Sequence, residues 1–428
     1  MFKKIILFST IILVSATIFA QGRVGSPYTR YGIGDIYNCT SVRNLALGGL
    51  SYTLPYNNDL NFINPARTGN IDTLTFIFDF GLNGGLRKYS ILEPKSNHTK
   101  SDFQLTHLMF GFSVFKWWKS SVGLLPFSNV GYLIRANDTL LNVDKDYLYS
   151  GYGGINRVVL NNSFSPLKNL SIGFNVSYLF GKIYQSNAID FNDDSGAFLN
   201  VVEQNGIKIN DLTFEGGVNY TINLNSKNSC VLGFVYGHNS NLNSQRNTIV
   251  YNTLSTGSSE VVDTIYQSDK EKGTIGLPRK TGFGVGYNYN NSFFMGIDYT
   301  INNWQDSKFY GISDSLSNGM DLSFGIEYKP NGFNETSYNK FWDGVSYRGG
   351  LHYNNTYFKL ASGETLISDF GISFGLGLPM KRSKTSYNFS VQLGQRGTLE
   401  NNLIKENYII FGLSFNVADM WFVKSKYD

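Results

Sequence analysis

The stretch NYIIFGLSFNVAD at residues 407–419 alternates between bulky apolar side chains and small or polar ones. One parity carries Ile409, Phe411, Leu413, Phe415 and Val417, and the other carries Ile410, Gly412, Ser414, Asn416 and Ala418. Because successive side chains of a strand point to opposite faces, the pattern predicts a strand with one apolar face. That face needs a partner, which is either the second sheet of a soluble sandwich or the lipid around a closed barrel.

Four earlier stretches repeat this alternation. They are LTFIFDFGLN at 74–83, LSIGFNVSYLFG at 170–181, DLTFEGGVNYTINL at 211–224 and DFGISFGLGL at 369–378. Their second face is mostly Gly, Ser, Thr and Asn with few charges, whereas the water-facing side of a soluble sheet normally carries many Lys, Glu and Arg. The runs also exceed the ~5–6 residues typical of soluble strands and reach the roughly 9–11 that cross a bilayer.

We therefore predict an all-β protein, a transmembrane antiparallel β-barrel with lipid outside and a polar lumen. Composition agrees, because aromatic residues make up 15% and charged residues only 16%, with 45 glycines, which favours strands and tight turns over helices. The alternative is a soluble secreted sandwich, which would place Phe174, Phe374 and Phe411 in a dry interior and Gly375 and Ser414 in solvent.

Turn signals divide the barrel into about fourteen strands. They lie near 73–86, 102–116, 120–135, 146–164, 169–186, 207–224, 229–240, 274–289, 292–303, 318–329, 344–360, 366–379, 386–396 and 407–418. Short connections such as KWWKS and SPLKN alternate with long polar ones at 187–206, 241–273 and 304–317. Outer-membrane barrels have an even strand number, short periplasmic turns and longer external loops, so we predict the outer membrane of a Gram-negative cell, with both termini on the periplasmic side.

The first twenty residues, MFKKIILFSTIILVSATIFA, have two lysines, an apolar run and a small residue before Gln21. This is the layout of a secretory signal peptide, so the sequence predicts a signal peptide at 1–20, an N-terminal segment at 21–70 and the barrel at 71–428. The segment does not alternate, but it is richer in Tyr, Leu and Ile than a free linker. We expect it to fold into the polar lumen as a hatch that closes it.

Other functional classes receive little support. The formal net charge of +4 gives no basis for nucleic-acid binding. The two cysteines, Cys39 and Cys230, are too few for a disulfide scaffold, and both a bridge and two free thiols remain open. The four histidines have no metal-ligand spacing, and no G-x-S-x-G or phosphate-binding loop occurs. We predict no enzymatic activity, no cofactor and no metal site.

The segment LALGGLSYTLPYNNDLNFINPARTGNI at 45–71 resembles the hatch region of the outer-membrane long-chain fatty acid transporter (FadL-like) family, with that family's Asn-Pro-Ala on Asn64, Pro65 and Ala66. GTIGLPRKTGFGVGY at 273–287 is also similar to it. The resemblance implies a fourteen-stranded channel that takes up hydrophobic molecules and releases them sideways through the wall. SPYTRYGIGDI at 26–36 and the C-terminal DMWFVKSKYD, which lacks a terminal aromatic residue, depart from the family and indicate a distant branch.

Pro126 marks a candidate gap in the wall. Proline donates no hydrogen bond to the ladder, and in a closed barrel every strand is central, so Pro126 predicts a weakened pairing, unless it lies at the periplasmic end of its strand or at an ordinary bulge. The family's lateral opening lies at a kink of the third strand, which the resemblance places at Pro126 and Phe127. Charges on the inward parity predict a lumen network: Asp79, Glu215, Asp298, Glu327, Arg348 and Arg396.

Two functions follow from this prediction. The first is a transport channel for hydrophobic or amphiphilic, fatty-acid-like small molecules, with outer-membrane lipid and the transported molecule as partners. In it the hatch around Asn64 moves, Pro65 stiffens its turn, and the molecule leaves near Pro126; Arg348 or Arg396 would suit a carboxylate head group. The second is a structural or assembly barrel that binds proteins at its external loops, for example beside a secretion apparatus.

Overall fold

The computed structural model describes residues 25–38, 41–54, 59–92, 95–140, 143–191, 198–254, 256, 261–312, 316–333, 336–360, 365–380 and 383–420. The predicted signal peptide at 1–20 and Cys39 lie outside these residues. Cys230 lies on the wall as a free thiol. Among the described residues, no helix has the length and apolarity that crossing a bilayer requires.

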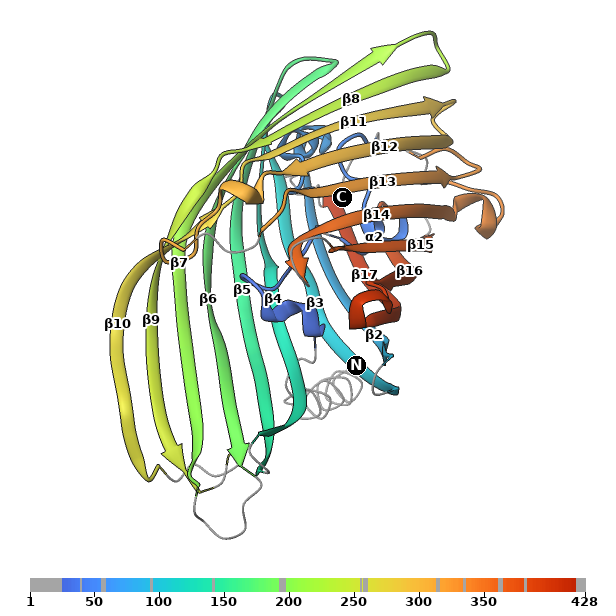
Figure 1. Ribbon diagram of the computed structural model, residues 1–428. Coiled ribbons are helices and arrows are strands. Elements are labelled where there is room, and N and C mark those ends of the chain that lie inside the picture. Colours follow the sequence, from blue (N-terminus) through green and yellow to red (C-terminus); the bar gives the residue numbers. More distant parts are fainter. Residues whose placement is uncertain are drawn as a thin grey trace, which may run out of the picture.

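The chain forms one closed antiparallel β-barrel (Figure 1). Each wall strand pairs with its neighbour in sequence, and the last strand, β17 (Lys405–Met420), pairs with the first wall strand, β2 (Thr75–Ile91), which closes the cylinder. Two wall strands change direction part of the way along and are divided into two segments each, β8 with β9 and β10 with β11. The described wall therefore has fourteen strands, and the predicted fold is confirmed.

The other wall segments are β3 (Ser96–Phe115), β4 (Trp118–Leu140), β5 (Val143–Leu167), β6 (Leu170–Phe191), β7 (Asn200–Asn223), β8 (Asn228–Gly237), β9 (Ser240–Thr253), β10 (Asp263–Leu277), β11 (Lys280–Tyr289), β12 (Phe293–Asn302), β13 (Gly319–Tyr328), β14 (Ser346–Leu360), β15 (Thr365–Pro379) and β16 (Ser386–Arg396). Short 3-10 helices in the connections are η3 (Trp304–Asp306), η4 (Phe341–Gly344) and η5 (Glu400–Asn402). The N-terminal segment contributes η1 (Pro27–Arg30), β1 (Asp35–Ile36), α2 (Val42–Ala46) and η2 (Pro65–Asn70).

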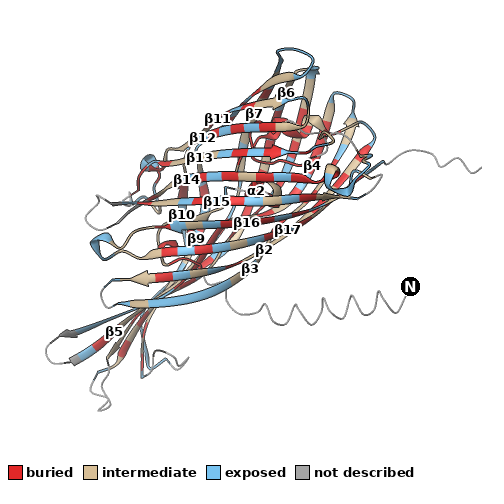
Figure 2. Cartoon of the chain, turned by 90° about the vertical axis from the view of Figure 1, so that its right-hand side faces the viewer, coloured by how far each residue is buried: buried red, intermediate tan, exposed pale blue. Residues whose placement is uncertain are grey.

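Buried and exposed residues alternate along the wall strands, as the sequence predicts (Figure 2). On β17, Phe411 is 53% exposed, whereas Ser414 is 2% exposed. Phe174 and Phe374 also lie on the outer face, at 44% and 52% exposure. A continuous outer surface of this kind is far larger than the apolar patches of soluble proteins and matches the surface that lipid covers. The soluble sandwich alternative is therefore wrong.

Replacing Phe411 with Arg is expected to lower the free energy of unfolding in a bilayer by about 2–4 kcal/mol, the cost of a cation on the lipid face near mid-depth. Urea-induced unfolding in lipid vesicles measures it. Thr99→Arg, at an exposed position four residues into β3, is the control and should change stability little. Equal effects of the two variants would contradict the placement of Phe411 against lipid.

Two predicted connections turn out to be strands. The predicted loop at 241–273 is the β9–β10 hairpin, and most of 187–206 belongs to β6 and β7. The prediction failed because these strands are polar on both faces and give no period-two signal. β4, β5, β6 and β7 reach 22–25 residues, and together with β9 and β10 they project beyond the remaining strands (Figure 1). This outer sheet contains exposed polar pairs such as Arg246–Glu271, at 2.8 Å.

The described residues of the N-terminal segment, 25–38, 41–54 and 59–71, pack against the inward faces of the strands. Apolar side chains of this segment meet the few inward-facing apolar side chains of the wall in separate small clusters, such as Leu60, Phe62 and Ile71 with Met109 and Val159. Leu47, Leu50 and Leu54 surround Phe294 in the same way. Burying these side chains stabilises the seated segment, because each contributes roughly 1.5–3 kcal/mol when it is fully removed from water.

Candidate functional site

The Asn64-Pro65-Ala66 motif forms the start of η2. Asn64 is its N-cap, and its side-chain Oδ1 accepts a hydrogen bond from the backbone N–H of Ala66 at 3.1 Å. Its Nδ2 donates to the carbonyl oxygen of Tyr52 at 3.0 Å, which joins two parts of the segment. Pro65 occupies the first helical position, where its missing N–H removes no helical hydrogen bond and its fixed φ suits the turn. The motif therefore organises the turn by itself.

The wall beneath this motif is built to receive it. Asn161 of β5 donates to the carbonyl oxygen of Pro65, and Ser163 donates to that of Ala66, both at 3.0 Å. Glycine at positions 173 and 217 allows the close approach, since a Cβ on Gly173 would lie 2.3 Å from the Pro65 carbonyl carbon. A Cβ on Gly217 would lie 2.4 Å from Asn64 Oδ1. These small and polar inward residues are a seat for the motif.

A second contact fixes the residues before the motif. The carboxylate of Asp298, on β12, accepts the backbone N–H groups of Ser51 and Tyr52 at 2.6 and 2.7 Å. The Tyr52 hydroxyl lies 2.6 Å from Thr300 Oγ1 on the same strand. Asp298 thus satisfies two buried backbone donors of the N-terminal segment, which cost free energy if they are left without partners.

Buried charges tie α2 to the wall. Arg43 lies 3.6 Å from Asp59 within the segment and 3.4 Å from Glu327 on β13. Glu327 is also 3.1 Å from Arg348 on β14, which donates to Asn388 at 2.7 Å. Burial raises the pKa of the Asp59 carboxyl, and Arg43 opposes that shift. Removing one member of such a set leaves a buried charge without compensation, which is strongly destabilising.

All six predicted lumen charges point inward, but they do not form one network. Only Glu327 and Arg348 contact each other. Asp79 lies 3.0 Å from His107, and Glu215 lies 3.4 Å from Lys280, both pairs within the wall. Three of the six contact the N-terminal segment: Asp298, Glu327 and Arg396. The wall charges are therefore divided between pairing within the wall and holding the segment.

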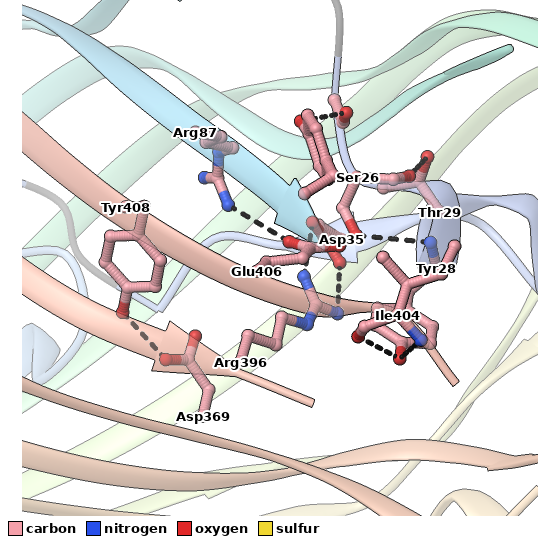
Figure 3. A network of polar contacts seen from close by, with 12 residues as sticks. Ser26, Tyr28, Thr29, Asp35, Arg87, Asp369, Arg396, Ile404, Glu406 and Tyr408 are labelled. Carbon is pink, nitrogen blue, oxygen red and sulfur yellow. Dashed lines mark hydrogen bonds and ion pairs between the residues drawn. The ribbon is translucent and has the colours of Figure 1, made fainter. Parts of the chain in front are cut away.

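Residues 26–37, here called the strap, contain the SPYTRYGIGDI stretch and lie along the inner wall (Figure 3). At one end Ser26 donates to Glu406, and the Tyr28 hydroxyl donates to the Ile404 carbonyl oxygen. At the other end both carboxylate oxygens of Asp35 accept from Arg396, at 2.7 and 2.8 Å. Burial, with a smaller effect from Glu406, raises the pKa of Tyr28 to about 12. The strap is thus held by charged and neutral hydrogen bonds at both ends.

The wall is incompletely paired between β3 and β4. Their pairing runs only from Phe115–Trp118 to Leu108–Leu124, although β3 stays paired with β2 to its first residue and β4 with β5 to its last. Pro126 and Phe127 follow at once on β4, and the β4–β5 register shifts between Pro126 and Ser128. The two predicted residues therefore lie where two neighbouring strands separate.

A cavity of about 360 Å³ lies inside the barrel. Its lining combines the strap and the residues that follow it with wall residues, and it reaches Thr106, Pro126 and Phe127 beside the β3–β4 gap. Much of the remaining lining is charged or polar, including Asp298, Asp321, His352 and Tyr408. The described residues contain no group of three or more His, Cys, Asp or Glu that could hold a metal ion. The lining is suited to a molecule with polar as well as apolar parts.

Arg157, on β5, is an unusual member of this lining. It is 7% exposed, and its Nε has no hydrogen-bond partner. Within the described residues its guanidinium forms no ion pair; its neighbours are the Phe127 ring, 5.9 Å away, and the charge of Glu215, which Lys280 already pairs. By contrast, Arg87 and Arg396 in the same cavity have carboxylate partners.

Sequence reasoning missed Arg157 as well as Asp35 and Tyr37. The stretch INRVVLNN around Arg157 is apolar on both parities, so its inward direction gave no signal. Asp35 and Tyr37 lie in the segment before the barrel, where no period assigns a face. The sequence did offer one signal: the GDIY end of the strap carries an acidic residue, and the predicted barrel has inward-facing arginines that could pair with it.

Solved structures with the same fold are channels. A Pseudomonas aeruginosa FadL homologue is 12% identical, with 90% of this chain and 99% of that chain covered and a TM-score of 0.57. The Ralstonia pickettii toluene transporter TbuX is 14% identical, over 89% and 98%, with a TM-score of 0.52. The Pseudomonas putida toluene transporter TodX is 14% identical, over 92% and 100%, with a TM-score of 0.53. At these identities the likeness establishes the fold alone.

Sequence comparison gives a different family name. No curated protein matches this chain. The FadL-like resemblance is supported as a likeness of fold and does not extend to long-chain fatty acids as the ligand. A family model described as BamG matches residues 1–428. Because that match spans the whole chain, the protein belongs to the BamG family.

Proposed function

We propose that this protein is an outer-membrane channel for hydrophobic or amphiphilic small molecules of the fatty-acid type. In this proposal the segment at 21–70 is a hatch that closes the lumen, and the molecule leaves sideways through the wall near Pro126 and Phe127. Both termini lie on the periplasmic side. The apolar outer surface of the wall supports a membrane location, and the short β3–β4, β5–β6, β7–β8 and β11–β12 connections, at the end where β2 begins and β17 ends, support this orientation.

The observation that carries the proposal is the connection of the inner cavity to the β3–β4 gap. The same cavity is lined by the strap, by Ser51 of the hatch and by Pro126 and Phe127 at the gap. A molecule in it would therefore contact both parts that have to change for release, the hatch and the wall. A closed barrel with paired strands throughout would offer no such route, because every backbone group of its wall would be engaged.

Arg157 supports an anionic head group in the transported molecule. A guanidinium that is removed from water and has no ion pair is a strong site for a carboxylate, which it binds through two parallel hydrogen bonds. Phe127 and Leu179 line the same cavity and would contact the apolar part of the molecule. This arrangement replaces the earlier expectation for Arg348 and Arg396, whose guanidinium groups already bind Asn388 and Asp35.

Uptake of a radiolabelled fatty acid tests the channel function. Cells that express the protein should accumulate the acid faster than cells that lack it, with equal outer-membrane integrity in both. The variant Gly217→Leu keeps the barrel but places a side chain where Asn64 contacts the wall. It therefore tests whether uptake depends on the contact between the hatch and the wall, in addition to the presence of the barrel. Equal uptake with and without the protein would reject the channel proposal.

A second candidate is a structural or assembly barrel with protein partners, and the outer sheet favours it. Leu133 is 70% exposed, and the stacked rings of Tyr152 and Tyr184 lie 5.0 Å apart, all on strands that extend beyond the rest of the wall. Exposed aromatic pairs of this kind are common in protein interfaces. Native electrophoresis after mild solubilisation should then show a larger assembly that Tyr152→Ser with Tyr184→Ser reduces to the barrel alone, while uptake would not depend on the protein.

A further inference from the structure

We infer that the strap is the gate of the lateral opening: it completes the wall at the β3–β4 gap, and it must leave β4 before anything crosses there. This inference deepens the proposed function, since it names the element that regulates exit. The strap belongs to the part of the sequence that departs from the FadL-like pattern, and the proposed channel path leaves its role unassigned.

The gap exposes strand edges that need partners. Beyond Leu124, β4 has no pairing with β3 in the described part of the chain, so its backbone groups on that side lack the neighbouring wall strand. The strap supplies one: Asp35 pairs with Asn129 and Ile36 with Ser128, antiparallel. The backbone N–H of Tyr37 donates to the Phe127 carbonyl oxygen at 3.0 Å. The strap thus acts as a short substitute strand on the open edge.

Tyr37 also spans the gap. Its backbone is bound to Phe127 on β4, while its side-chain hydroxyl donates to Gln104 on β3. A single residue therefore joins the two strands where they are otherwise separate. Gly34 permits the close approach just before it, because a Cβ there would lie 2.2 Å from the Asn129 carbonyl oxygen and its φ of +86° disfavours other residues.

Anchors on β16, β17 and β4 hold the strap in place. Asp35 is bound to Arg396 on β16 and Ser26 to Glu406 on β17, and Thr29 accepts the backbone N–H of Gly131 on β4 at 3.0 Å. Glu406 is also 3.7 Å from Arg87 of β2, so both ends of the strap share one polar cluster with β2, β16 and β17 (Figure 3). Because the cavity is lined by Asp35, Arg396 and Tyr408, a molecule that enters it contacts the anchors directly.

A reversible lock tests this inference. In a Cys39→Ser, Cys230→Ser background, Ile36→Cys and Ser128→Cys place thiols on directly opposed residues of an antiparallel pair, where a disulfide fits. Resistance to a maleimide-polyethylene glycol reagent after mild oxidation reports the bond. We expect oxidation to reduce fatty-acid uptake to that of cells without the protein and a reductant to restore it. The matched control is Arg246→Cys with Glu271→Cys, an opposed pair on the outer sheet, which should not affect uptake.

A second measurement does not depend on transport. Thr106→Cys in the same background places a buried thiol at the gap. If the strap seals the gap, Asp35→Ala with Tyr37→Ala should speed its reaction with a lipid-soluble thiol reagent at least about tenfold, the factor that corresponds to 1.4 kcal/mol. An unchanged reaction rate, absence of the disulfide, or a disulfide that leaves uptake at the control level would each overturn the strap inference. Absence of uptake in the unlocked parent, with a faster Thr106→Cys reaction, would reject the channel and keep the strap as a seal.

Discussion

Replacing Gly350 with valine is expected to unseat the segment around α2 and to open the barrel to small solutes, whereas Gly349→Val leaves it closed. Gly350, on β14, faces inward, and a Cβ there would lie 2.2 Å from both the Gly48 nitrogen and the Leu47 carbonyl carbon. These are backbone atoms that cannot move without displacing the segment. A Cβ on Gly349 would meet only the Ile326 side chain on the outer face, at 3.6 Å or more.

The two variants differ by one position and by no change of residue type, so they share any general effect of valine on strand formation. Ion conductance in planar bilayers measures the opening, and limited proteolysis within residues 41–54 measures the release of the segment. We expect both to increase strongly for Gly350→Val alone. A closed barrel with a protected segment in Gly350→Val would contradict the described seat, and equal leakage of both variants would indicate general damage to β14.

The barrel was predictable because its two environments differ so strongly. Lipid outside and a polar lumen inside impose opposite requirements on successive residues, so a single strand such as 407–418 already carries the whole pattern. The turn at Asn64 could be predicted for a related reason, because an Asn-Pro pair specifies a turn locally and needs no partner that is distant in sequence. These features depend on local sequence, and local sequence was sufficient for them.

The outer sheet and the strap were not predictable in this way. Strands β9 and β10 carry polar residues on both parities along most of their length, so in the sequence they look like a loop. The partners of the strap are distant in sequence, as with Asp35 and Arg396, and nothing in either neighbourhood specifies the other. Such pairings are decided by the closure of the barrel, which brings β17 beside β2.

The lumen is not purely apolar, because its wall carries charged side chains. Under the proposed function, these charges affect which small molecules the barrel could transport. Most inward charges are matched by a partner, as Glu215 is by Lys280 and Glu327 by Arg348. Matched pairs stabilise the wall and the seated segment but offer little to a ligand, because their hydrogen-bonding capacity is used. A charge without a match is therefore the feature by which the cavity would distinguish one molecule from another.

Arg157→Gln is expected to lower uptake of a fatty acid by roughly 10- to 150-fold, the range that corresponds to losing a charge-assisted hydrogen bond of about 1.5–3 kcal/mol. The substitution suits the question because Arg157 forms no ion pair within the described residues, and its carboxylate neighbour Glu215 keeps Lys280 as an ion-pair partner, whereas Arg396 is directly paired with Asp35. Barrel stability should therefore stay close to that of the parent. Uptake of the methyl ester of the same acid should change little, since the ester carries no charge for Arg157 to bind.

The matched control is Arg135→Gln. It also removes one positive charge, from an arginine that is 61% exposed on β4, the strand next to the β5 strand that carries Arg157. Competition between the acid and its ester, measured in the same cells, then isolates the head group from the apolar chain. If Arg157→Gln lowers the uptake of the acid and of the ester equally, Arg157 affects the shape of the cavity and does not bind the charged head group. An unchanged ratio of acid to ester uptake would remove the anionic head group from the proposed substrate and leave a channel for uncharged molecules.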